Sequence, residues 1–249
     1  MWRRHSIAAK KAAWDAWKSK SYALCSKIIQ IAARKWADPK MNPSLELALQ
    51  KARYHSVPRD IVDRAILKWS GQLEWDAVEE VFYEGYGPAG SALVIKTLTD
   101  NTNRTATAVK TMLHKFGWSL WLQNSVAWQF DEKWVIIIDW KVKKEFVKGK
   151  DVETILPLDS AQYEDELLNL EIDDLSVEDD TVIVFTQKTN FTSVLSGIES
   201  LWYHVVEADL QYIPQNEISL AGEDLDTLQR LVDMLDNDED VDKVWTNVA

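Results

Sequence analysis

The sequence predicts a multi-domain α+β protein, with an N-terminal three-helix bundle followed by two α+β domains. The chain has 249 residues, longer than an average domain, so two or three domains are expected. Apolar residues recur at helical spacing between residues 21 and 69. From residue 79 onward the pattern becomes one of short strand-like runs separated by turn residues. We therefore expect a linker near residues 70–80.

The helical part begins with a basic segment, residues 1–20, which has no complete apolar stripe. We expect a basic arm there that is partly disordered until it binds. Helices are predicted over about 21–35, from Asn42-Pro43 as N-cap and first helical residue, and from near Pro58. Together they predict a bundle over 21–75. Its expected outward basic residues are Lys27, Arg34, Lys35, Lys51, Arg53, Arg59, Arg64 and Lys68.

The second part of the chain begins with strands over 79–86 and 91–99, joined by the turn Gly87-Pro88-Ala89-Gly90. A helix over 103–116 and a strand near 125–130 follow. The next elements have the order β-α-β-β-α-β, and a helix and a strand then close the chain. Their predicted ranges are 134–139, 158–169, 172–177, 180–187, 190–201 and 203–213, then 222–236 and 241–248.

Charge is distributed very unevenly along the chain, whose net charge is −12. Residues 1–70 contain 15 Lys and Arg against 5 Asp and Glu, while residues 71–249 contain 13 against 35. This asymmetry is typical of a basic module that binds a polyanion and an acidic body that keeps the chain in solution. The alternative is that the two halves neutralise one another within the molecule.

Tryptophan is unusually frequent and glycine unusually rare, with 13 Trp and 8 Gly. Several tryptophans follow helical runs or occupy predicted chain reversals, where a positive φ favours glycine. One hypothesis is that UGA codons meant as glycine have been read as tryptophan. Its eleven positions are Trp2, Trp14, Trp17, Trp36, Trp69, Trp75, Trp118, Trp121, Trp134, Trp140 and Trp202. The alternative is that the tryptophans are stacking platforms for bases.

Several segments resemble the YebC family of probable transcriptional regulatory proteins. They include RHSIAAKKAA (4–13), FYEGYGPAGSALVIKTLTDNTNRTA (82–106), SVAWQFDEK and VDKVWTN, so the resemblance covers essentially the whole chain. It implies a helical bundle, an α+β domain over 79–132 plus 214–249, and an inserted ferredoxin-like domain over 133–213. It also implies a role in gene regulation. Bacterial members are regarded as DNA-binding, whereas relatives include a mitochondrial translational activator and ribosome-associated factors.

The predicted site is a nucleic-acid-binding surface in which cations neutralise backbone phosphates. A solvated basic tail is the alternative for the first segment. The candidate residues are Arg3, Arg4, His5, Lys10, Lys11, Lys18, Lys20, Arg34, Lys35, Arg53, Arg59, Asn101, Asn103 and Arg104. For the last three, two interpretations stay open. They form a helix N-terminus that binds phosphate, or Asn101 or Thr102 caps the helix while Arg104 braces the bundle.

Catalysis is not expected. The four histidines are dispersed, and neither HExxH nor a phosphate-binding glycine loop is present. Cys25 falls among apolar helical residues and is expected to be a buried structural thiol. No cofactor, metal, small-molecule substrate or membrane partner is expected, and the cytoplasm is the expected compartment. The leading hypothesis is a DNA-binding transcriptional regulator. The alternatives are a ribosome-associated translation factor that binds structured RNA and, third, an enzyme with a site between the second and third domains.

Overall fold

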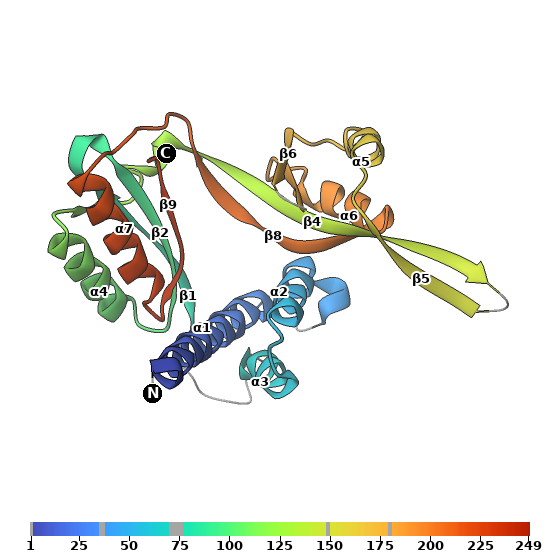
Figure 1. Cartoon of the computed structure of the whole chain (residues 1–249), viewed down its shortest axis with the longest axis horizontal. Coiled ribbons are helices and arrows are strands. Elements are labelled where there is room, and N and C mark those ends of the chain that lie inside the picture. Colours follow the sequence, from blue (N-terminus) through green and yellow to red (C-terminus); the bar gives the residue numbers. More distant parts are fainter. Residues whose placement is uncertain (1, 35–37, 70–76, 148–149, 179–180) are drawn as a thin grey trace. The chain divides into compact units, whose positions relative to one another are not determined.

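The computed structural model describes residues 2–34, 38–69, 77–147, 150–178 and 181–249 (Figure 1). Its helices and antiparallel sheets confirm the predicted α+β class. The chain divides into two compact units. Unit 1 comprises Met1–Phe130 and Pro214–Ala249, and unit 2 comprises Asp131–Ile213. The chain thus leaves unit 1 after Phe130 and returns to it at Pro214.

Unit 1 begins with a helical bundle of α1 (Trp2–Ala33), α2 (Pro43–Tyr54) and α3 (Arg59–Trp69). Helix α1 packs against both other helices. Asn42 caps α2 as predicted, because its side chain accepts a hydrogen bond from the Leu45 amide at 3.2 Å. The Asn42 side chain also donates to the Ala32 carbonyl at 2.7 Å. The bundle core consists of Cys25, Ile29, Ala33, Leu45, Ala48, Ala52 and Ala65, so the expected burial of Cys25 is confirmed.

The first helix differs from the expectation of a separate basic arm over 1–20. One helix runs from Trp2 to Ala33, whereas the sequence predicted a helix starting near residue 21. No Gly or Pro interrupts this stretch, and alanine and lysine, which are frequent in it, have high helix propensity. Propensity therefore extends the helix through a segment that has no apolar stripe of its own.

The sheet of unit 1 has the order β3-β1-β2-β9, with all neighbours antiparallel. Its strands are β1 (Glu79–Tyr86), β2 (Ala92–Thr99), β3 (Ser119–Trp121) and β9 (Val241–Thr246). Helices α4 (Thr102–Lys115) and α7 (Glu223–Asp236) lie side by side over the sheet (Figure 1). Leu93 and Ile95 of β2 pack with residues of these two helices to form the core between the layers: Val109, Leu113, Leu228, Leu231 and Leu235.

A strand predicted near 125–130 is replaced by a loop with a short 3₁₀ helix, Ala127–Gln129. The buried carboxylate of Glu84 holds this loop by accepting hydrogen bonds from three backbone amides. The donors are Asn124 at 2.5 Å, Val126 at 2.5 Å and Ala127 at 2.9 Å. The apolar residues of the segment satisfy a strand pattern, but this long-range anchor determines the observed backbone.

The sheet of unit 2 has the order β5-β4-β7-β6, and β8 pairs with β4. The predicted β-α-β-β-α-β order is present as β4, α5, β6, β7, α6 and β8. Strand β4 is longer than predicted and forms an unpredicted hairpin with β5, which extends past helices α5 and α6 (Figure 1). The bounds are β4 Phe130–Val147, β5 Lys150–Pro157, α5 Ser160–Leu167, β6 Asp174–Glu178, β7 Thr181–Thr186, α6 Phe191–Ser200 and β8 Tyr203–Pro214.

The tryptophans occupy more varied positions than the sequence predicted. Trp202 has a φ of 66°, as expected for a glycine position. The predicted hairpin turn at Asp139-Trp140 is wrong, because β4 continues through it, and Trp134 also lies within that strand. Gly117, with a φ of 78°, follows α4 in place of the expected Trp118. Trp36 and Trp75 lie outside the described residues.

Candidate nucleic-acid interface

The helical backbone of α1 divides its basic positions into two stripes. Residues seven apart in a helix are separated by about two turns and lie on the same side. Positions 4, 11 and 18 therefore share one stripe, and positions 3 and 10 lie about a quarter-turn around the helix from it. Lys20 and Lys27 are also seven apart and lie on the other side of the helix. We name the first group, residues 3, 4, 10, 11 and 18, the α1 basic stripe.

The second stripe contacts the acidic segment at the end of α7. The Lys27 ammonium lies 2.7 Å from a carboxylate oxygen of Asp240 and 3.0 Å from the Glu239 carbonyl oxygen. The Lys20 ammonium donates to the Asp236 carbonyl. Burial lowers the pKa of Lys20, against the opposing effect of Asp236 and neighbouring carboxylates. Lys27 was expected to point outward, and that expectation is wrong: its side chain is only 17% exposed.

Asp240 joins the bundle to the start of α4. Its buried carboxylate accepts hydrogen bonds from Arg104 at 2.9 Å and from the Thr105 hydroxyl at 2.8 Å, besides Lys27. Burial acts to raise the pKa of Asp240, but the hydrogen bonds from Lys27, Arg104 and Thr105 outweigh it, so the pKa is lowered. We name these four residues the Asp240 cluster.

Arg104 and Thr105 belong to the segment 82–106 that resembles the YebC family, so the end of this segment contributes to the Asp240 cluster. Asn101 caps α4, because its side chain accepts from the Arg104 amide at 3.0 Å. Arg104 pairs with Asp100 at 3.0 Å as well as with Asp240. Asn103 is exposed, and its backbone carbonyl accepts from Thr107. This geometry favours the capping and bracing interpretation over a phosphate site at the helix N-terminus.

The other predicted residues are dispersed over the bundle. Lys18 is exposed and its ammonium lies 5.6 Å from the centre of the Tyr22 ring. Arg53 and Arg59 are exposed and lie near acidic neighbours, Glu46 at 3.5 Å and Asp63 at 3.9 Å. Arg34 is exposed. Lys35 lies outside the described residues, as do the side chains, though not the helical backbone, of Arg3, Arg4, His5, Lys10 and Lys11.

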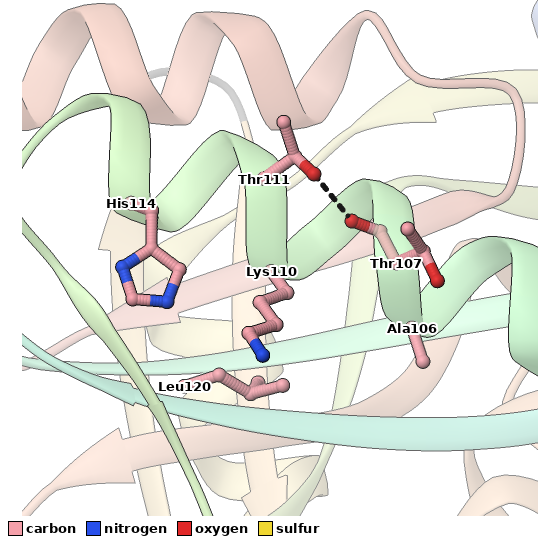
Figure 2. A pocket seen from close by; sticks show the side chains of 6 residues that line it. All are labelled: Ala106, Thr107, Lys110, Thr111, His114 and Leu120. Carbon is pink, nitrogen blue, oxygen red and sulfur yellow. Dashed lines mark hydrogen bonds between the residues drawn. The ribbon is translucent and has the colours of Figure 1, made fainter.

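Sequence reasoning missed a basic face on α4. Lys110 and His114 line an open hollow next to Leu120 of β3, together with Ala106, Thr107 and Thr111 (Figure 2). Their spacing of four residues places both on one side of the helix. This i, i+4 spacing of Lys110 and His114 is present in the sequence, but no sequence signal shows that the two side chains line a hollow.

Over the part of the chain that the structure describes, no helix is long and apolar enough to cross a membrane. Within the same residues, histidine, cysteine and carboxylate side chains form no group of three or more suited to a metal ion.

The fold and the Asp240 cluster define a class of α+β proteins in which a basic helical bundle is joined to an acidic body. The chain belongs to the TACO1/YebC family. The family's N-terminal domain matches residues 3–72, and its second and third domains match residues 78–248. These matches confirm the resemblance to the YebC family recognised in the sequence.

Three known proteins illustrate the similarity. A probable transcriptional regulatory protein of Thermoanaerobacter pseudethanolicus is 35% identical over 98% of this chain and 94% of its own length. Another of Dictyoglomus turgidum is 35% identical over 97% of this chain and 92% of its own. The crystal structure of a conserved hypothetical protein from Aquifex aeolicus superimposes with a TM-score of 0.80 at 25% identity, covering 94% and 91% of the two chains.

Proposed function

We propose that this protein is a cytoplasmic transcriptional regulator that binds DNA through the α1 basic stripe and the exposed cations of the bundle. The observation that supports this most is the division of α1 into two stripes. Lys20 and Lys27 are occupied by the acidic end of α7, while none of the basic positions 3, 4, 10 and 11 shares their side of the helix. The names of the curated relatives, probable transcriptional regulatory proteins, agree with this role.

Binding through such a stripe is governed by phosphate contacts. Each cation that neutralises a phosphate releases condensed counterions, which gives affinity without reading sequence. The remaining acidic surface of the chain repels a polyanion, so the basic stripe also orients the complex. Asn101 and Arg104 contribute indirectly in this proposal: Asn101 caps α4, and Arg104 pairs with Asp240, which also pairs with Lys27 of the bundle.

A second candidate is a ribosome-associated translation factor that binds structured RNA. The stripe offers cations on one continuous helix, with no dedicated group that reads base edges, and RNA helices are recognised mainly by shape and phosphate position. The same basic residues bind the nucleic acid in both candidate functions, and only the partner, DNA or RNA, differs.

The two candidates are separated by comparing partners under one set of conditions. Full-length protein is titrated against a duplex DNA in an electrophoretic shift assay, and co-sedimented with ribosomes, each over the same salt series. Tighter binding to DNA supports the regulator. If the protein still binds ribosomes at salt concentrations that abolish the DNA shift, the transcriptional regulator is rejected in favour of the translation factor. Binding to neither contradicts both.

A further inference from the structure

Residues 101–130 form an acid-free stretch within the acidic part of the chain. They contain no Asp or Glu, although residues 71–249 contain 35 in total. The same stretch carries Arg104, Lys110, His114 and Lys115. A polyanion that is repelled by the rest of residues 71–249 meets no carboxylate belonging to this segment.

Two of these basic side chains are available to a ligand. Lys110 and His114 are exposed, and neither side chain has a hydrogen bond or ion pair with any residue that the structure describes. Arg104, in contrast, is held by Asp100 and Asp240. The Lys110 and His114 side chains extend from α4 toward Leu120 of the edge strand β3 (Figure 2).

The hollow that they line has a volume of about 470 Å³. Leu120 and Ala106 give it an apolar part. The hydroxyls of Thr107 and Thr111 donate to helix carbonyls at 2.8 and 2.7 Å, so their oxygens remain free to accept. A lysine and a histidine beside an apolar surface match a backbone phosphate together with its adjoining sugar.

We propose that this hollow is a second phosphate contact for a nucleic-acid strand, in which Lys110 and His114 bind a backbone phosphate and Leu120 contacts the adjoining sugar. It rests on the proposed function. The strand lies across the α4 face of unit 1, and this contact adds affinity to that of the α1 basic stripe.

The test replaces Lys110 with alanine in the full chain, and Lys188→Ala is the matched control, an exposed lysine of unit 2. Lys110→Ala is expected to weaken binding several-fold and to reduce the slope of log affinity against log salt by about 1. Lys188→Ala is expected to change neither. If the two variants have the same nucleic-acid affinity and salt slope, the proposed phosphate contact at Lys110 is wrong. If the unmodified chain does not bind nucleic acid, the proposed function itself is wrong.

A second experiment distinguishes a nucleic-acid strand from a free nucleotide as the ligand of the hollow. Adenosine monophosphate is titrated into the unmodified chain and into Lys110→Ala, followed by the chemical shift of the His114 ring. A strand contact predicts only millimolar binding of the mononucleotide. Micromolar binding that depends on Lys110 and leaves nucleic-acid affinity unaltered would identify a nucleotide site and overturn the strand contact.

A different observation concerns Trp202, at the end of α6. Its φ of 66° lies in the left-handed region, which disfavours a bulky aromatic residue and favours glycine after a helix. Two other tryptophans of the eleven glycine candidates, Trp118 and Trp134, have buried indole N–H groups without a hydrogen-bond partner among the described residues. Such a group normally finds a partner when it is buried.

We infer that the natural protein carries glycine at position 202, encoded by UGA. The left-handed backbone at position 202 then carries no strain. Trp128, whose indole donates to the Ser125 carbonyl at 2.9 Å, is a genuine tryptophan by the same reasoning.

The test reads codon 202 in the gene and the corresponding peptide by mass spectrometry of protein from its native cells. A UGA codon with glycine in the peptide is expected, and a UGG codon or a tryptophan in the peptide overturns the inference. In the chain as printed, Trp202→Gly should raise the Tm by roughly 2–4 °C. The control Trp128→Gly should lower it, and a lowered Tm in Trp202→Gly also counts against the inference.

Discussion

Replacing Asp240 with alanine is expected to lower the free energy of unfolding of unit 1 by about 2–3 kcal/mol. The carboxylate is buried and accepts from Lys27, Arg104 and Thr105. Its removal leaves the largely buried Lys27 ammonium without its partner. Because Arg104 is half exposed and recovers solvation, the loss should lie below that for a fully buried pair.

Urea unfolding followed by circular dichroism measures this effect. Glu217→Ala is the control, since Glu217 is an exposed carboxylate of unit 1, and its replacement should change stability by less than about 0.5 kcal/mol. A loss in Asp240→Ala no larger than in the control would show that the Asp240 cluster does not hold the bundle on the sheet.

The same variant should alter the acid dependence of stability. The folded pKa of Asp240 lies below its ordinary value, because the hydrogen bonds from Lys27, Arg104 and Thr105 outweigh the effect of burial. Its stabilising contribution is therefore complete above the unfolded pKa of about 3.9 and is lost as the pH falls through the folded pKa. The difference in unfolding free energy between the unmodified chain and Asp240→Ala should be constant near pH 6 and shrink below about pH 4. A difference that grows on acidification would contradict the lowered pKa.

The second large effect concerns nucleic-acid affinity. Replacing Arg3, Arg4, Lys10 and Lys11 with glutamine should lower affinity at about 0.15 M salt by roughly a hundred-fold or more, and reduce the salt slope by about 3–4. Glutamine retains helix propensity, so α1 should persist. Circular dichroism checks that the helix content is unchanged.

A matched variant removes the same number of charges from residues 143–150 of unit 2. It carries glutamine at Lys143, Lys144, Lys148 and Lys150, and should bind nearly as tightly as the unmodified chain. If this variant loses affinity and the α1 variant keeps it, the polyanion binds unit 2 and the α1 basic stripe is not the interface.

Much of the fold could be predicted because local patterns and local structure agree. Asn42-Pro43 marks the start of α2, and the turn Gly87–Gly90 joins β1 and β2 in the observed register. Apart from β5, the order of elements in unit 2 follows from short strand and helix patterns. These signals act over a few residues, where capping and turn geometry determine the backbone.

The differences between the predicted and the observed structure come from contacts between residues that are distant in sequence. Glu84 binds the backbone amides of Asn124, Val126 and Ala127, and no local pattern near 125–130 reveals that loop. Lys27 has the sequence context of an outward cation, yet it pairs with Asp240, 213 residues later. The basic residues of the site are evident in composition, but the structure was needed to separate those that brace unit 1 from the α1 basic stripe.

The most direct measurement of the central proposal is the affinity of the unmodified full chain for duplex DNA over a salt series. Log affinity is expected to fall linearly with log salt, with a slope steeper than about −3, as contact with four or more phosphates requires. No detectable binding at the lowest salt concentration, or an affinity that does not change with salt, would contradict a phosphate-binding stripe on α1.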